Sequence, residues 1–234
     1  MCQFDFSFFL SEIWIAVQYI PITLLLSIVP MVVGLILGFF LAVCRIQKIK
    51  VLNELTSIYV ILIRGVPMVL LILVTFFGFE YGFDAFSNFF HLGISSGKIP
   101  MLVIGIFVLC VISVAFMTES IRTALQSVEK GQIEAAYSIG MTTASTYRSV
   151  IIPQAMPVAV PILGNTFIGL VKGTALVYMI GIVDILDATK IQANANYRYL
   201  EAYIAAAIIF WIMCIAIEKG TTVLSKKVND FAKE

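Results

Sequence analysis

Long apolar runs alternate with short polar stretches along this chain. Five runs are long enough to cross a bilayer as α-helices, at about 20 residues per crossing. An outer-membrane β-barrel would instead show segments of about ten residues with alternating hydrophobicity. The pattern therefore predicts an all-α, polytopic membrane protein with about five transmembrane helices. The runs cover about 20–44, 55–79, 100–120, 157–183 and 200–218.

The two ends of the chain are more polar than the runs between them. Residues 1–18 mix Phe, Trp14 and a few polar groups, which is typical of a segment at the headgroup level. Residues 221–234 are charged and predict a cytoplasmic tail. We therefore expect an interfacial segment, a transmembrane domain over 19–220 and a tail.

Composition agrees with a membrane protein and excludes several other classes. Of 234 residues, 61% are hydrophobic and only 12% are charged, whereas soluble domains carry about 25% charged residues. The net charge is +1 and no basic stripe indicates a nucleic-acid partner. The four cysteines are far apart and His91 is the one histidine, so no metal site can form at ligand spacing.

Lys and Arg residues near the span ends predict the orientation. Cytoplasmic loops carry an excess of these residues. The predicted topology places ten on one side of the membrane and three on the other, so the N-terminus lies outside, the C-terminus inside and residues 130–153 in the cytoplasm. The ten are Arg45, Lys48, Lys50, Arg122, Lys130, Arg148, Lys219, Lys226, Lys227 and Lys233, against Lys98, Lys190 and Arg198.

Residues 130–153 form a polar, helix-forming stretch among the apolar runs. Gly140 can adopt the left-handed conformation that ends a helix. Thr142 or Thr143 can cap a second helix, and Pro153 would stop it. The stretch predicts either a bent knob that inserts into a soluble partner or a plain interfacial hairpin. One face of the first helix would hold Ile133, Ala136, Tyr137 and Gly140, with Glu134 and Ser138 opposite.

Five segments in order resemble the permeases of ABC transporters for polar amino acids. Residues 130–153 resemble the EAA loop of that family, and 63–79 resemble its Arg-Gly-x-Pro segment. Residues 23–45, 119–136 and 163–186 are similar to its first span, the stretch leading into the EAA loop and its fourth-span signature. The residues that carry the resemblance include Glu134, Ala135, Ala136, Gly140, Ile152 and Pro153, then Arg64, Gly65 and Pro67, and then Gly164, Asn165, Lys172 and Thr174.

Three departures from the family pattern leave the substrate open. Val66 stands where the family usually has Ser or Thr, and Asp184 where it usually has Glu. Thr123 and Ala124 replace a Gly-rich step. Cystine, glutamine, arginine and histidine permeases share the motifs, so any of these classes is compatible with the chain.

The resemblance implies a type-1 ABC permease in a bacterial inner or plasma membrane. The EAA helix would couple to a separate ATPase subunit, through Glu134, Ala135, Ala136, Gly140 and Pro153. That subunit would bind ATP and Mg²⁺, since this sequence has no GxxxxGK[ST] loop. The other implied partners are a second permease, either a copy or a paralogue, and an extracellular amino-acid-binding protein.

Two charges inside the spans are candidates for the substrate pathway. A lysine at the centre of a span costs on the order of 2.5–3.5 kcal/mol, so Lys172 should face protein or water. With Asn165 and Thr174 it could line the pathway and meet a substrate carboxylate, or it could snorkel or pair with another subunit. Arg64 lies roughly 14 Å deep, at about 1.5 Å per residue, and pairing with Glu119 is favoured over ligand contact.

An amino-acid zwitterion needs one cationic and one anionic site. Asp184 follows the fourth span at its outer end, where it could bind an ammonium group or simply be solvated, and the second is favoured. Lys172 with Asp184 or Glu119 is therefore the candidate pair. Pro67 should kink or unwind the second span beside these groups, as is tolerated where backbone faces a cavity.

Two other kinds of protein remain as alternatives. A secondary transporter driven by an ion gradient would show inverted repeats, and the sequence has no convincing repeat. A membrane scaffold that transports nothing would have no need of Lys172 and Arg64 within its spans.

Overall fold

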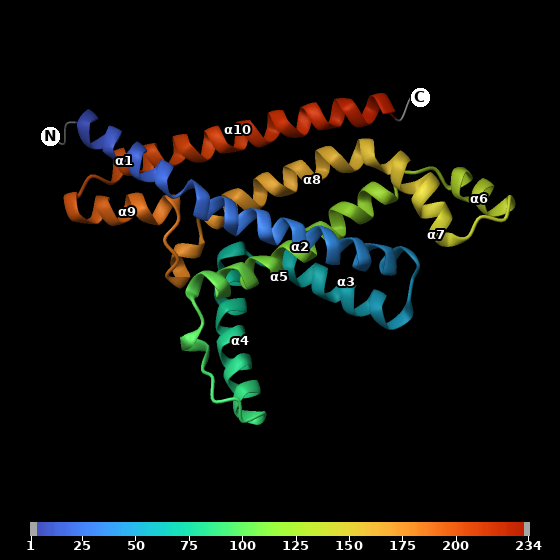
Figure 1. Ribbon diagram of the computed structural model, residues 1–234, viewed down its shortest axis with the longest axis horizontal. Helices are drawn as coiled ribbons and strands as arrows, with labels where there is room; N and C mark the ends of the chain where they lie inside the picture. The colour runs from blue at the N-terminus through green and yellow to red at the C-terminus, as the bar shows by residue number, and fades with distance from the viewer. Residues whose placement is uncertain (1–3, 232–234) are drawn as a thin grey trace.

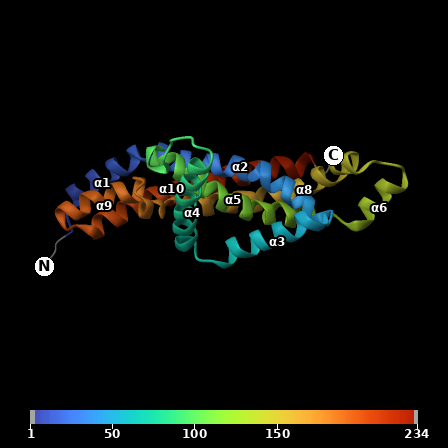
Figure 2. The same ribbon diagram turned by 90° about the horizontal axis from the view of Figure 1, so that it is seen from below.

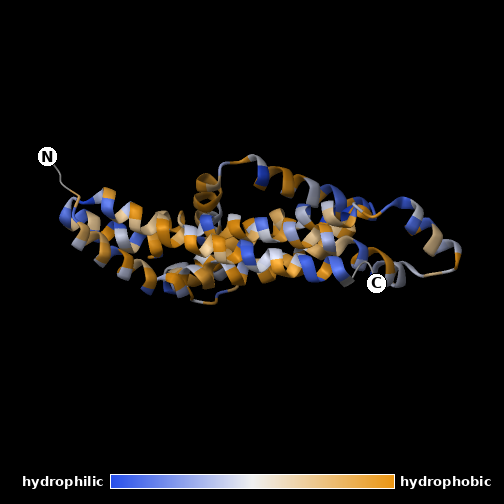
Figure 3. Cartoon of the chain, turned by 90° about the horizontal axis from the view of Figure 1, so that it is seen from above, coloured by the Kyte–Doolittle hydropathy of each residue, from blue (hydrophilic) through white to orange (hydrophobic). Residues whose placement is uncertain are grey.

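The computed structural model describes residues 4–231, and all regular elements in that range are helices. The long helices form an elongated bundle, seen from the side in Figure 1 and from below in Figure 2. Hydrophobic residues occupy most of its length, and hydrophilic residues gather toward its two ends (Figure 3). The helices along the bundle are α2 (Ile20–Ile46), α5 (Met101–Leu125), α8 (Ile152–Thr174) and α10 (Tyr199–Phe231).

Five helical segments of the described chain are long and apolar enough to cross a membrane, which confirms the predicted number. Their ends differ from the expected spans, mainly because helices continue into polar sequence. The segments are Phe6–Ile46, Met68–Phe89, Met101–Leu125, Thr143–Thr174 and Tyr199–Asp230. The side of the membrane on which each end lies stays a prediction.

The start of the chain forms a helix that packs on the bundle. In α1 (Phe6–Gln18), the Asp5 carboxylate caps the first turn by accepting hydrogen bonds from the Ser7 and Phe8 N–H groups at 3.0 and 3.1 Å. This helix contacts α10 and α9 (Ile185–Asn196). The described part of the N-terminal segment is therefore helical, and its position at the headgroup level stays a prediction.

The helices α2 and α5 approach closely at two glycines. A Cβ added to Gly38 would lie 2.9 Å from the Thr118 nitrogen of α5, and one added to Gly34 would overlap Ser113. The Ser113 hydroxyl also donates a hydrogen bond to the Pro30 carbonyl at 2.8 Å. Small residues allow this approach in lipid, where helices associate through van der Waals packing rather than hydrophobic burial.

The expected second span consists of two helices. α3 (Lys50–Gly65) ends before Val66, whose φ of −103° and ψ of 141° are extended, and α4 (Met68–Phe89) follows Pro67. Proline disfavours helical geometry at the residue before it, which explains the break that the sequence predicted. In Figure 1, α4 turns away from the long axis of the bundle.

The helix α4 extends well beyond the expected end of its span. It includes Glu80 and Asp84, which lie beyond the predicted span 55–79. Asp84 accepts hydrogen bonds from the Ser96 N–H at 2.6 Å and hydroxyl at 3.1 Å. These bonds attach the short 3₁₀ turn η1 (Ser96–Lys98) to the side of α4, so the connection to α5 is ordered by the carboxylate.

Pro153 does not stop a helix, and that prediction is wrong. After α6 (Lys130–Ser138) and α7 (Thr143–Thr146), a π-turn over Tyr147–Ile151 leads directly into α8. Pro153 lies in the first turn of α8, where its missing N–H is tolerated. The wider π-turn just before it changes the local hydrogen-bond pairing and lets the helical path continue.

Two segments outside the predicted spans are helical. Residues 185–196, between the predicted spans 157–183 and 200–218, form α9, which follows the 3₁₀ turn η3 (Val177–Ile180) and Gly181 with φ of 82°. The predicted tail continues α10 as far as Phe231. Gly164 of α8 lies against α10, since a Cβ there would come within 2.6 Å of the Thr221 hydroxyl.

Candidate translocation path and coupling surface

One face of α5 borders two cavities in succession. Ile112, Phe116 and Glu119 recur at the i, i+4, i+7 spacing of a single helix face. The first two line a cavity of about 480 Å³, which also contacts Met68 and α8. Glu119 lines a second cavity of about 370 Å³ with Arg45 and Arg64. Polar and charged groups therefore follow the apolar part of this face.

The facing residues of α8 include two of the predicted pathway residues. Asn165 and Gly169 line the larger cavity, and Lys172 continues the same i, i+4, i+7 face toward the α9 end. Lys172 is exposed. Thr174 does not join them, because it is fully buried and its hydroxyl donates to the Val171 carbonyl at 2.8 Å. The structure thus aligns Asn165 with Lys172 and separates Thr174 from both.

A hydrogen bond joins α5 and α8 beside the larger cavity. The Ser120 and Thr166 hydroxyls lie 3.0 Å apart, and Thr166 lines the cavity. This pair was not predicted, because nothing in the local sequence pattern relates two hydroxyls on separate helices. Across the cavity, Met68 packs on Gly173, where an added Cβ would lie 3.0 Å from the Met68 sulfur. The first residue of α4 is thereby held against α8.

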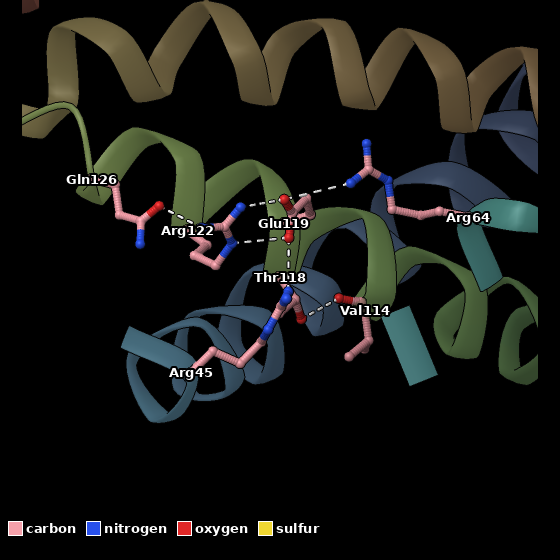
Figure 4. Close-up of polar contacts among 7 residues, drawn as sticks. All are labelled: Arg45, Arg64, Val114, Thr118, Glu119, Arg122 and Gln126. Carbon is pink, nitrogen blue, oxygen red and sulfur yellow. Dashed lines mark hydrogen bonds and ion pairs between the residues drawn. The ribbon is translucent and has the colours of Figure 1, made fainter. Parts of the chain in front are cut away.

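Three arginines surround the Glu119 carboxylate (Figure 4). Arg122 approaches with its Nη2 atom at 2.5 Å from Oε1 and Nε at 3.0 Å from Oε2, and the Arg45 Nη1 atom lies 2.7 Å from Oε2. Arg64 is more distant, with Nη1 at 3.6 Å from Oε1. The predicted pairing of Arg64 with Glu119 is confirmed, and the cluster carries two positive charges in excess.

The other two arginines of this cluster were not predicted as partners of Glu119. Arg122 follows Glu119 by three residues, a spacing at which helical side chains meet, so a local signal existed. Arg45 lies on α2, and only the packing of α2 against α5 brings it to the carboxylate.

Asp184 is fully buried, so the prediction that it is solvated is wrong. Its Oδ1 atom accepts a hydrogen bond from the Asp187 N–H at 3.1 Å and caps α9. Within the described residues its Oδ2 atom has no hydrogen-bond partner. Burial raises the pKa of Asp184 to about 6. Among residues 4–231, Lys172 forms no ion pair with Asp184 or Glu119.

A second buried carboxylate lies on α1, at the end of the bundle where α9 also packs. Glu12 is 1% exposed, and its Oε2 atom has no hydrogen-bond partner among the described residues. Glu12 was not among the predicted site residues. An acidic residue within an apolar run is itself a signal for a functional position.

The predicted coupling segment projects from the opposite end of the bundle (Figure 1). Gly140 follows α6 with φ of 82°, which confirms the predicted left-handed turn, and the Thr142 hydroxyl caps α7 by accepting from the Ser145 N–H at 3.3 Å. Glu134 and Ala135 are exposed, whereas Ala136 is buried against the bundle. The outer face of the turn therefore offers a carboxylate and open backbone.

The chain matches a known family over most of its length. Residues 34–230 fit the sequence model of the binding-protein-dependent transport system inner membrane component. The chain belongs to this family. The predicted resemblance and fold class are confirmed, and the chain is a membrane-spanning permease subunit of the ABC-transporter class with the type-1 permease fold.

Its relatives include several amino-acid permeases. The probable amino-acid permease protein YxeN of Bacillus subtilis (strain 168) is 36% identical over 215 residues, covering 92% of each protein. The L-cystine transport system permease protein TcyL of the same organism is 31% identical, over 90% of this chain and 86% of TcyL.

Two solved structures share the fold. The crystal structure of an amino acid ABC transporter with histidines has a TM-score of 0.81 and 32% identity, over 96% of this chain and 99% of its own. An inward-facing structure of the MetNI methionine ABC transporter has a TM-score of 0.73 over 92% of this chain and 96% of its own. Its identity of 19% makes it evidence for the fold alone.

Proposed function

We propose that this permease imports a polar amino acid along the aligned faces of α5 and α8. The observation that carries the proposal is the succession of polar groups through an otherwise apolar bundle. Lys172, Asn165 and Thr166 lie on α8, and Glu119 lies on α5. Arg64, at the end of α3, pairs with Glu119 and continues the series. Charged groups within a membrane span commonly mark a substrate pathway. The names of the relatives support an amino acid as the substrate.

The two ends of a zwitterion would be bound by opposite charges. Lys172 is exposed beyond the larger cavity and would bind the α-carboxylate. Asp184 has a buried oxygen without a partner in the described chain and would bind the ammonium group, with Glu12 as a second acceptor. A buried polar atom without a partner is costly, so a ligand that supplies the missing hydrogen bond is favoured.

Energy would come from an ATPase subunit that binds the α6–α7 turn. Glu134 would make a polar contact with that subunit, and the left-handed Gly140 would let the two backbones approach. Pro153, in the first turn of α8, would pass the motion on to the transmembrane helix. ATP and Mg²⁺ would be bound by the ATPase, because the sequence of this chain holds no Walker A loop.

The complete transporter would contain further subunits in a bacterial cell membrane. A second permease, either a copy or a paralogue, would complete the pathway. An extracellular binding protein would deliver the amino acid at the end that holds α9. The family is itself defined by dependence on a binding protein, which supports this partner.

The deciding experiment is uptake by the reconstituted transporter. Proteoliposomes that contain the permease, its ATPase and its binding protein would be supplied with labelled amino acid, and L-cystine, L-glutamine, L-arginine and L-histidine would compete. We expect uptake that needs ATP and is inhibited by one class of competitor. Uptake that instead follows an imposed ion gradient without ATP would support the secondary-transporter alternative, and no uptake of any of the four would refute the proposal.

A further inference from the structure

Arg64 is the least satisfied member of the Glu119 cluster. The carboxylate has two oxygens, and Arg122 and Arg45 occupy both with hydrogen bonds of 2.5–3.0 Å. Arg64 makes a long ion pair of 3.6 Å and no hydrogen bond within residues 4–231. A guanidinium has five N–H donors in a planar fork. Most of the Arg64 donors are therefore available to another acceptor, while Glu119 helps to hold the group in place.

These donors face a cavity of suitable size and charge. The cavity of about 370 Å³ is walled by Val60, Ile61 and Gly65 in addition to the charged groups, and the Arg64 side chain is 47% exposed. Pockets for small ligands begin at about 300 Å³. Because two arginines and one glutamate line this cavity, its charge favours an anion. A planar oxyanion such as a carboxylate matches the guanidinium fork with two parallel hydrogen bonds.

The position of the cavity connects it to the proposed pathway. Phe116 precedes Glu119 by three residues on the same face of α5 and lines the larger cavity. Arg64 and Met68 flank the break before α4, and each lines one of the two cavities. An amino acid that leaves the larger cavity toward the α6 end of the bundle therefore meets Arg64 next.

We infer that Arg64 forms an inner binding site for the α-carboxylate of the transported amino acid, through which amino acid on the cytoplasmic side inhibits further import. The inference rests on the proposed function. Occupancy from the inside would keep the inward-facing state filled, because a ligand stabilises the conformation that it binds. The outer site at Lys172 and the inner site at Arg64 would thus hold the same carboxylate at successive stages.

The test measures inhibition by internal amino acid in proteoliposomes with the complete transporter. The lumen, which corresponds to the cytoplasm, would be loaded with the imported member of L-cystine, L-glutamine, L-arginine and L-histidine. Each rate is normalised to that of the same variant with an empty lumen. We expect Arg64→Gln to raise the half-inhibitory internal concentration by about tenfold or more, since charge-assisted hydrogen bonds are lost. The half-inhibitory concentration of Arg64→Lys should lie between those of wild type and Arg64→Gln, because lysine keeps the positive charge but lacks the planar fork of N–H donors.

Matched controls separate the carboxylate from other causes. Lys50→Gln removes an exposed positive charge from the same helix outside the cavity and should leave the inhibition unchanged. The amine that corresponds to the imported amino acid without its carboxylate (cystamine, 4-aminobutanamide, agmatine or histamine) should inhibit only weakly. Its inhibition should be the same in wild type and in Arg64→Gln. Native-like assembly of each variant with the ATPase shows that it has folded.

The outcomes distinguish this inference from the proposed function. If wild-type transporter imports none of the four amino acids, the proposed function itself has failed. If import is normal but Arg64→Gln and wild type are equally sensitive to internal amino acid, the inner site does not exist. If Arg64 instead controls a dependence on phosphatidylglycerol in the vesicles, with no change in inhibition by amino acid, its partner is a lipid phosphate and the inference is overturned.

Discussion

At the scale of single residues, charge pairing decides what each buried group can do. Glu119 is surrounded by three guanidinium groups and is fully engaged in holding them. Lys172 has no carboxylate partner in the described chain, and Asp184 has one oxygen without a partner. Groups that lack an ion-pair or hydrogen-bond partner are the better candidates for substrate contact, because a bound substrate gives them an interaction that the free protein lacks.

Lys172→Ala tests the outer carboxylate site. We expect the substrate concentration for half-maximal uptake to rise by about tenfold or more, because a charge-assisted hydrogen bond is lost. Lys98→Ala is the matched control, since Lys98 is an exposed lysine of the loop before α5, away from both cavities. An unchanged half-saturation concentration in Lys172→Ala would remove this residue from the site.

Asp184→Asn tests the burial of a carboxylate outside the membrane spans. The folded protein has a pKa for Asp184 of about 6 against the ordinary 3.8, so between about pH 4 and pH 6 it holds a proton that the unfolded chain has lost. The free energy of unfolding should therefore fall as pH rises through this window and stay level above it. Asparagine keeps the cap of α9 but does not titrate.

The measurement is the midpoint of thermal unfolding in detergent for wild type and Asp184→Asn. We expect the variant to gain stability relative to wild type between pH 4 and pH 7. Asp230→Asn, at an exposed carboxylate near the end of α10, should show no such change. If the unfolding midpoints of Asp184→Asn and wild type differ by the same amount at pH 4 and pH 7, then ionisation of Asp184 does not destabilise the folded protein.

At the scale of elements, breaks in the helices place the functional surfaces. The Val66–Pro67 break separates α3 from α4 and sets Arg64 and Met68 at neighbouring cavities. The Gly140 turn separates α6 from α7 and exposes Glu134 at the end of the bundle. In each case a residue with restricted or unusual backbone geometry positions the side chains that follow or precede it.

Glu134→Lys tests the α6–α7 turn as the contact with the ATPase. Charge reversal should repel the surface that Glu134 approaches, so the permease should insert in the membrane but fail to assemble or fail to couple ATP hydrolysis to uptake. Co-purification of the ATPase and uptake in vesicles are the two measurements. Glu129→Lys, an exposed reversal just before α6, is the control. Normal assembly together with normal uptake in Glu134→Lys would refute the assignment.

At the scale of the whole molecule, the bundle has two chemically different ends. One holds α9 with the buried Asp184, and the other holds the α6–α7 turn and the charged end of α10 (Figures 1 and 3). The excess of Lys and Arg at the second end predicts that it is cytoplasmic. The proposed direction of import depends on this orientation.

Cysteine labelling in intact cells tests the orientation. Asn88→Cys, exposed near the end of α4, should react with a membrane-impermeant maleimide above the wild-type background. Lys227→Cys, exposed on α10, should react only after the membrane is permeabilised. The opposite pattern would reverse the topology and place the α6–α7 turn outside the cell, where no ATPase could bind it.

The residue pattern was sufficient to predict the fold class, the number of spans, the family and several local features. Hydrophobic runs of sufficient length, the Pro67 break and the Gly140 turn all follow from covalent and helical geometry that each segment carries within itself. Such features need no knowledge of neighbouring helices. The pairing of Arg64 with Glu119 was also predicted, because a charged side chain within the predicted spans has few other oppositely charged partners.

Which charged groups pair with each other, and which keep unused hydrogen-bond donors or acceptors, depends on how the helices pack. Arg45 reaches Glu119 because α2 packs on α5, and this contact leaves Arg64 with spare donors. The same packing buries Asp184, which a reading of its local polarity had placed in water. The helix continues through Pro153 because of the π-turn over Tyr147–Ile151, which the residue pattern did not predict. Burial and partner choice are properties of several helices together, so one segment cannot encode them alone.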